Sequence, residues 1–212
     1  MKSQISNEFL VGVIFILIIY VASLTGFNSF AKTQMLQSES AREVCYTISS
    51  AISSAYVGGD GFSTNVTMPY SLDSEFNFFV IAMNKSNIDV NWPGGLVSCS
   101  IITQNITTGL MYAGKFSINN INSTIYISSI TTDKLLYGSG ETVTINGSYF
   151  LNNVSLALYV NDVIVLGYPV EVLNVNNTFS YATMLLTQEH YKVEVNDINM
   201  STFYAEREFD VI

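Results

Sequence analysis

Residues 9–31 read FLVGVIFILIIYVASLTGFNSFA, a stretch of 23 residues that contains no charged side chain. A helix of about 20 apolar residues is long enough to cross the ~30 Å hydrocarbon core of a membrane. The fold and the location of the protein depend on this stretch, because it is either removed after export or kept in the mature chain. The sequence predicts a membrane-entering helix here.

Three interpretations of this stretch compete. A cleaved secretory signal is supported by Ser29-Phe30-Ala31, a small-x-small site that precedes Lys32. Against it, the apolar run exceeds the usual ~7–15 residues of a secretory signal, and the basic region before it is the single Lys2. The second interpretation is a permanent membrane anchor. The third is a retained helix of a less usual kind, and it depends on the residues before position 9.

Glu8 stands directly before the apolar stretch and favours the third interpretation. A carboxylate placed deep in lipid costs about 2.5–3.5 kcal/mol on insertion scales, so it needs a cation in the same apolar environment. Residues 1–9, MKSQISNEF, resemble the class III signal peptide of archaeal type IV pilin-like proteins, the archaellin and pilin superfamily. That signal has a short basic leader and a small residue, followed by Gln-x-Ser-x-Glu-Phe. Ser3 stands where the family mostly has Gly.

The resemblance implies how the chain is processed and assembled. Prepilin peptidase would cut between Ser3 and Gln4, remove residues 1–3 as a leader, and leave the apolar helix on the mature protein. The new α-amine of Gln4 and the carboxylate of Glu8 would pair between neighbouring subunits in a low-dielectric core, and Phe9 would begin the apolar assembly segment. The implied partners are prepilin peptidase, an assembly ATPase with its membrane platform, other pilin subunits and the membrane.

The helix is predicted to continue beyond the membrane, so that it covers residues 4–57, with an amphipathic second half at 32–57. Apolar side chains recur there at intervals of three and four, which places them on one face: positions 41, 44, 45, 48, 51, 52 and 55. The sequence Gly58-Gly59-Asp60-Gly61 predicts the end of the helix. A calcium site at Asp60 is the less favoured alternative, because one carboxylate among glycines is a poor ligand set.

Residues 58–130 are predicted to form a pilin-like β domain that packs on the amphipathic face. Their alternating apolar and polar residues predict strands separated by short turns. The strands are expected at 76–83 and 86–92, which form a hairpin, and at 96–102 and 123–128, with a turn at Gly114-Lys115.

Residues 131–212 are predicted to form a second β module. Residues 137–147, YGSGETVTING, resemble the opening strand of macroglobulin-like and immunoglobulin-like (Ig-like) surface modules, Tyr-x-x-Gly-Glu-x-Val-x-Ile-x-Gly. Val143 and Ile145 should point inward. Two later strands of a sandwich are expected at 154–160 and 191–195. The predicted fold class is α+β: a long N-terminal helix, a β-sheet domain packed on its second half, and a C-terminal β-sandwich.

The two cysteines provide one predicted link between helix and sheet. Cys45 lies on the amphipathic face, and Cys99 lies in a predicted strand that can cross it. In an exported chain two cysteines favour a disulfide, which would close a long loop and stabilise the fold by about 3–5 kcal/mol. Two buried free thiols are the alternative.

Eight Asn-x-Ser/Thr sequons follow the apolar stretch, whereas the 20 Asn of the chain would give about four by chance. They predict a glycosylated surface outside the cell, and an excess that comes from Asn- and Thr-rich β turns is the alternative. The sequons begin at Asn65, Asn84, Asn105, Asn122, Asn146, Asn153, Asn176 and Asn199.

Charge and composition exclude several classes of function. The chain has 17 acidic and 8 basic residues, whereas nucleic-acid binding needs a stripe of Lys and Arg. One His and two Cys fall short of the roughly four ligands of a structural zinc site, so neither a metal nor a cofactor is expected. His190, in a segment at 187–190 that predicts a turn, is the single candidate for a Ser-His-Asp site, and a surface histidine is favoured. The chain is not expected to be an enzyme.

The predicted function is therefore structural. The chain would be a subunit, major or minor, of an archaeal type IV pilus-like surface filament whose glycosylated β exterior takes part in adhesion. Its helix would exchange contacts with lipid for contacts with other helices. The alternative is a membrane-anchored binding protein that does not polymerise and uses its Ig-like module to bind a polysaccharide or a solute. The predicted location is the cell membrane, with a single span, and the extracellular filament.

Overall fold

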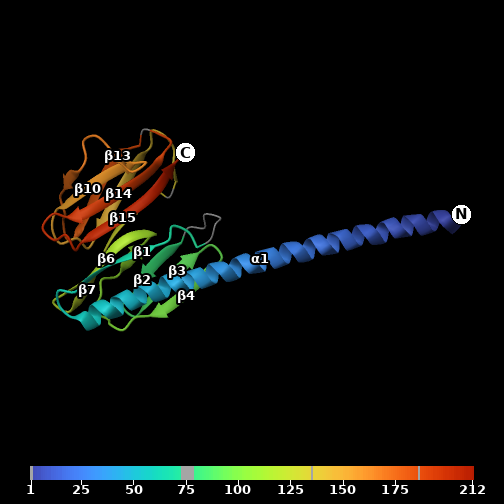
Figure 1. The fold of residues 1–212 in the computed structure, drawn as a ribbon, viewed down its shortest axis with the longest axis horizontal. Coiled ribbons are helices and arrows are strands. Elements are labelled where there is room, and N and C mark those ends of the chain that lie inside the picture. The colour runs from blue at the N-terminus through green and yellow to red at the C-terminus, as the bar shows by residue number, and fades with distance from the viewer. Residues whose placement is uncertain (1, 73–78, 135, 186) are drawn as a thin grey trace.

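The computed structural model shows one long helix that projects from a β-rich body (Figure 1). It describes residues 2–72, 79–134, 136–185 and 187–212, and the side chains of residues 2–10, 12 and 27–30 lie outside this description. Helix α1 covers Lys2–Gly58. The predicted α+β fold class, with a long N-terminal helix followed by a large antiparallel β-sheet domain, is confirmed.

Helix α1 ends where its glycines take a backbone conformation that disfavours other residues. Gly59 and Gly61 have φ angles of 79° and 84°. Such left-handed residues commonly terminate helices, because glycine reaches this region without a steric cost. Asp60, between them, accepts a hydrogen bond from the backbone N–H of Asn122 at 2.6 Å. The predicted helix end is confirmed, and Asp60 ties it to a distant turn.

The second half of α1 lies along the first part of the β body (Figure 1). Its buried face is the predicted one, with Ala41, Val44, Ile48 and Ile52 at most 2% exposed. These side chains belong to one hydrophobic core with the inner residues of neighbouring strands, four of which make most of the contact with α1. The strands are β1 (Ser63–Met68), β3 (Asn87–Trp92), β4 (Gly95–Ser100) and β6 (Gly114–Ile121).

Two sheets make up the β body. The smaller has the antiparallel order β4-β3-β2-β5, with β2 at Val80–Met83 and β5 at Gly109–Met111. The β2–β3 pair is the predicted hairpin, although residues 76–78 of the first predicted strand lie outside the description. The larger sheet follows the order β11-β10-β14-β15-β6-β7-β9-β13.

The turn predicted at Gly114-Lys115 is wrong. Gly114 begins strand β6, and a Cβ atom placed on it would lie 2.2 Å from the carbonyl oxygen of Glu206. The glycine is needed because another strand approaches closely, and because its φ angle of 135°, directly after a bend at Ala113, disfavours other residues. The turn that joins β6 to β7 (Thr124–Thr132) lies at Asn122 and Ser123, whose φ angles of 50° and 64° are those of a tight hairpin turn.

Strand β7 connects two hydrophobic cores. It pairs with β6 on one side and with β9 (Thr142–Ser148) on the other. Ile125 and Ile127 belong to the core beneath α1, whereas Ile130 belongs to the second core. The predicted boundary between residues 130 and 131 therefore falls inside a continuous strand.

The second core is enclosed, in a sandwich-like arrangement, by the two end portions of the larger sheet, β10-β14-β15 and β9-β13. Val143 and Ile145 are fully buried in it, as predicted. His190, expected in a turn, instead begins a strand, because the chain pairs with the C-terminal strand from this residue onward. The remaining strands are β8 (Leu136–Tyr137), β10 (Val154–Val160), β11 (Val163–Ile164), β12 (Val170–Val172), β13 (Thr178–Met184), β14 (His190–Asp197) and β15 (Tyr204–Val211).

Asp197 ties two loops of the sandwich together. Its carboxylate is buried and accepts hydrogen bonds from the backbone N–H groups of Leu151 and Asn152 at 3.1 and 2.8 Å. It also accepts from the backbone of Asn199 and Met200, each at 3.0 Å. Four backbone donors thus depend on one side chain.

We expect Asp197→Asn to lower the free energy of unfolding by about 2 kcal/mol, because one charged acceptor becomes a donor that faces other donors. Denaturant titration of the two proteins measures the difference. Asp162→Asn is the matched control, since the Asp162 side chain is 88% exposed and its removal should change stability by less than about 0.5 kcal/mol. Equal losses in the two variants would contradict the role given to Asp197.

Candidate functional site

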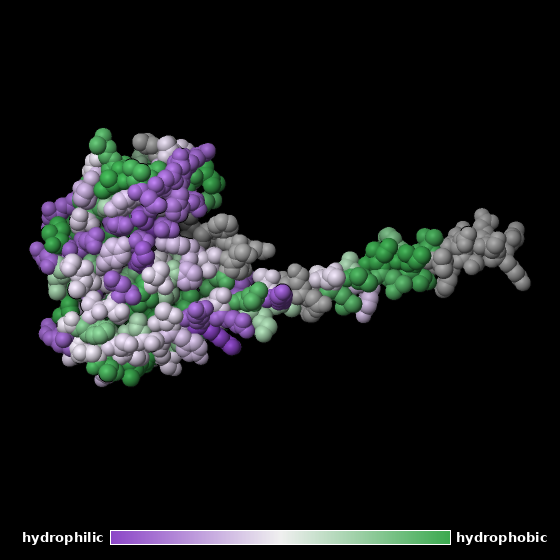
Figure 2. Space-filling model, viewed as in Figure 1, coloured by the Kyte–Doolittle hydropathy of each residue, from purple (hydrophilic) through white to green (hydrophobic). Residues whose placement is uncertain are grey.

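The first functional feature is the part of α1 that projects from the body. The described residues between 11 and 26 are all exposed, and they form the apolar section of the helix in Figure 2. From Val13 to Gly58 the helix is long and apolar enough, by length and composition, to cross a membrane. The hydroxyls of Ser23 and Thr25 donate hydrogen bonds to the backbone carbonyls of Ile19 and Val21, so they bring little polarity to this surface.

The residues that are predicted to be processed and to act in assembly lie at the far end of this helix. Ser3, Gln4, Glu8 and Phe9 are within the backbone of α1, but their side chains are outside the description. Because Gln4 and Glu8 are four residues apart, about 6 Å, slightly more than one helical turn, separates them along the axis. An amine formed at Gln4 would therefore lie close to the level of the carboxylate.

A disulfide fastens the second half of α1 to the small sheet. The structure bonds Cys45 to Cys99, with Cα atoms 6.0 Å apart and a separation of 54 positions in the sequence. One turn further along the helix, Ser49 Oγ donates to the carbonyl of Ser100 at 2.9 Å. The bridge therefore links the projecting helix to β4 covalently.

The sequons lie on the surface of the β body. Six of the eight asparagines are exposed, and Asn146 and Asn153 are half-buried. Asn122 and Asn176 occupy turns with positive φ angles, where the side chain stands clear of the strands. Asn105, by contrast, donates its amide N–H to the carbonyl of Ser123 at 2.6 Å, so modification there would replace a hydrogen bond.

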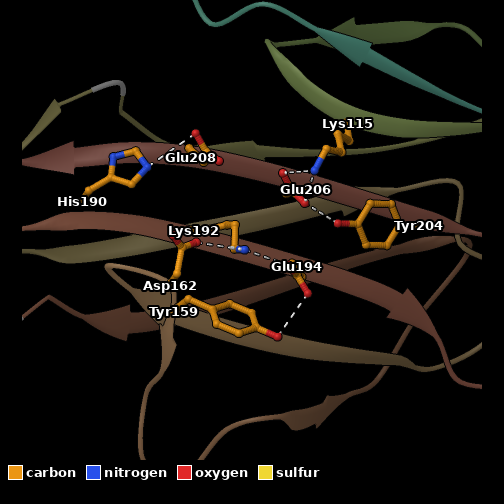
Figure 3. A network of polar contacts seen from close by, with 9 residues as sticks. All are labelled: Lys115, Tyr159, Asp162, His190, Lys192, Glu194, Tyr204, Glu206 and Glu208. Carbon is orange, nitrogen blue, oxygen red and sulfur yellow. Dashed lines mark hydrogen bonds and ion pairs between the residues drawn. The ribbon is translucent and has the colours of Figure 1, made fainter.

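A network of charged side chains covers the outer face of β10, β14 and β15 (Figure 3). Glu206, 5% exposed, is held by the ammonium of Lys115 at 2.8 Å and by the hydroxyl of Tyr204. Glu194, directly opposite Glu206 on β14, pairs instead with Lys192 at 3.2 Å. Each of these two facing carboxylates thus has its own cation, which offsets their repulsion.

His190 extends this network to the end of β15. Its Nδ1 lies 2.9 Å from Asp210, and its Nε2 lies 3.4 Å from Glu208. The hydrogen bond with Asp210 is the main cause that raises the pKa of His190 above its usual 6.5. Because the imidazole touches two carboxylates, its proton is held more tightly than in water.

We expect the single histidine to titrate with a midpoint above 6.5, as an NMR titration of its ring resonances measures. The folded-state pKa is raised, so the stability it contributes is fully present below pH 6.5 and is lost as the pH rises through the folded-state pKa. Asp210→Asn should move the midpoint downward, whereas Asp162→Asn should leave it unchanged, because Asp162 is not among the groups that raise this pKa. A wild-type midpoint below 6.5 would contradict the pairing.

A pocket of about 600 Å³ opens at one edge of β15. Residues 205–206 of that strand pair with β6 and residues 210–211 pair with β8, so the edge between them has no strand partner among the described residues. The charged side chains at this opening are Arg207, Glu208, His190 and Asp210.

One feature of the sequence of β15 points to this pocket. Along β15, Ala205, Phe209 and Val211 are buried at alternate positions, and Arg207 stands at the position between the first two. A basic residue at a strand position whose neighbours point into the core is unusual, because burial of an unpaired charge is costly. The positions of Tyr70 and Tyr112, which join the pocket from distant segments, carry no such signal.

Comparison with known proteins leaves the family open. No family model matches the sequence, and no curated protein does. Among solved structures, a polysaccharide lyase shares part of the chain trace, with a TM-score of 0.32 and 12% identity. The match covers 56% of this chain but 18% of the lyase, and a likeness this low carries no conclusion about activity.

Proposed function

We propose that the chain is a structural subunit of an archaeal type IV pilus-like surface filament, cut by prepilin peptidase between Ser3 and Gln4. The observation that carries the proposal is helix α1 itself. One continuous helix has an apolar first half, whose described residues from 11 to 26 are exposed, and a second half with one face buried against a β body and disulfide-bonded to it. The apolar surface of such a helix is stable only in contact with lipid or with other apolar helices.

Assembly would replace helix–lipid contacts with helix–helix contacts. Because lipid and apolar side chains are equally apolar, close packing supplies the driving force and the paired charges of Gln4 and Glu8 set the register. The β body would then form the exterior of the filament. Mechanical shearing of native cells tests the proposal: the chain should be released in fibres that sediment, and a chain retained wholly in the membrane fraction would contradict it.

Glycosylation of the exterior is part of the same proposal. The six exposed sequon asparagines lie on the β body. The β body surrounds the end of α1 that is opposite its apolar section (Figure 1). We expect the native chain to be heavier than its bare polypeptide, and enzymatic or chemical deglycosylation should remove the excess. Intact-mass analysis that returns the mass of the bare polypeptide would contradict this part.

The second candidate is a membrane-anchored binding protein that does not polymerise. The pocket beside β15 favours it, because a pocket of about 600 Å³ is within the usual size range of small-ligand sites. The shearing experiment distinguishes the two candidates, since a non-polymerising protein would stay with the membrane.

A further inference from the structure

Arg207 is a buried cation that has no carboxylate partner in the part of the chain that the structure describes. It is 4% exposed, and burial lowers the pKa of its guanidinium. Its Nε donates to Thr132 Oγ1 at 3.0 Å, and its guanidinium carbon lies 4.8 Å from the centre of the Tyr112 ring. No carboxylate of the described residues lies within 4.0 Å of it. A charge in this position is expected to have a partner, because an unpaired one costs several kcal/mol.

The remaining donors of Arg207 belong to the pocket. The Nε–H bond to Thr132 uses one of the five N–H donors of the guanidinium, and the side chain lines the pocket beside the unpaired edge of β15. The two terminal nitrogens form no hydrogen bond within the described residues. A planar fork of this kind matches the two oxygens of a carboxylate.

The acidic residues at the opening are already paired. His190 lies within ion-pair distance of both Glu208 and Asp210, at 3.4 and 2.9 Å. Glu206, on the same strand, is held by Lys115. Among the described residues that line the pocket, Arg207 is therefore the cation that can pair with a negatively charged ligand.

The rest of the lining suits a ring with hydroxyl groups. Tyr70, 38% exposed, presents an aromatic surface, and Phe79 and Phe209 extend the apolar wall. The carboxylate of Glu208, which Tyr70 and His190 already contact, can accept a further hydrogen bond from a hydroxyl at the mouth. Few polar groups in a mostly apolar pocket are typical of small-ligand sites.

We propose that this pocket binds a hexuronic acid, with the sugar carboxylate on the guanidinium of Arg207 and the sugar ring beside Tyr70. The sugar comes either free or as a residue of an acidic polysaccharide, and the carboxylate chemistry is the same in both. Binding at this site does not depend on polymerisation. A filament subunit that takes part in adhesion could use it, and so could a membrane-anchored binding protein that does not polymerise.

Calorimetric titration of the full chain in detergent micelles tests the proposal with a matched pair of sugars. Galacturonic acid should bind, and galactose, in which a CH₂OH group replaces the carboxylate, should bind at least tenfold more weakly. Equal binding of the two sugars, or binding of neither, would overturn the assignment. Titration with oligogalacturonate distinguishes the two sources of the ligand. Binding tenfold tighter than that of the monomer would identify an acidic polysaccharide as the ligand, and equal binding would identify the free sugar.

Variants locate the binding. Arg207→Lys keeps the charge but loses the planar fork, and it should weaken galacturonate binding at least tenfold. Arg42→Gln, an exposed residue of α1 outside the pocket, is the control and should bind as the wild type does. Should the Arg207 variant unfold, Tyr70→Ala at the exposed rim should still weaken binding several-fold while the thermal midpoint is kept. Unchanged binding in a folded Arg207 or Tyr70 variant would overturn the proposed site.

Discussion

Glu8→Ala is expected to leave the cut between Ser3 and Gln4 intact and to abolish incorporation of the chain into filaments. The peptidase would act on the subunit in the membrane, before the carboxylate of Glu8 meets the amine of a neighbouring subunit. In the filament core each new amine would need a carboxylate, and its absence leaves an unpaired charge in an apolar environment, which costs several kcal/mol per subunit. A cost repeated along the fibre is enough to prevent assembly.

The experiment measures two quantities in cells: the mass of the N-terminal peptide, and the share of the chain in sheared fibres. Glu8→Gln keeps the shape and one acceptor without the charge, and it should assemble poorly. Glu39→Ala is the control, since Glu39 is an exposed acidic residue of the same helix beyond the apolar section, and it should assemble as the wild type does. Normal fibres from Glu8→Ala would refute the role given to this carboxylate.

Removal of the bridge between Cys45 and Cys99 should give the largest loss of stability. The disulfide closes a loop of 54 residues, and the chain-entropy relation assigns such a loop about 4 kcal/mol at 25 °C. The variant Cys45→Ala/Cys99→Ala should therefore unfold at clearly lower denaturant concentration. The helix would also lose its covalent connection to β4, so detachment of α1 from the small sheet should precede loss of the second core.

Reduction provides the matched comparison for this prediction. A reductant should lower the stability of the wild type to about the level of the double variant, and it should leave the variant unchanged. Thiol counting under denaturing, non-reducing conditions is the second measurement. A count near two thiols per chain in native material, or a wild type insensitive to reductant, would contradict the bridge.

Local patterns in the sequence were enough to predict the helix and several strands. The 23 uncharged residues, the spacing of three and four up to Ala55, and Gly58 at the helix end are signals carried by neighbouring residues. The inward positions of Val143 and Ile145 follow from the period of two in strands. These features depend on short-range geometry, so the sequence alone displays them.

The misplaced features depend on distant parts of the chain. Gly114 looks like a turn residue, but its role is set by the carbonyl of Glu206, 92 positions away. His190 looks like a turn residue until β15 pairs with it. The pocket is assembled from segments around Tyr70, Tyr112 and Arg207, and which of their side chains face one another is decided by strand pairing, not by local pattern.

The mass of the N-terminal peptide of the native protein tests the central claim most directly. A mature chain whose first residue is Gln4 would show that the leader is removed, that the apolar helix is retained, and that a free amine exists about one helical turn from Glu8. A chain that still begins at Met1 would be an ordinary membrane anchor, and one that begins at Lys32 would be a secreted protein; either start would contradict the account.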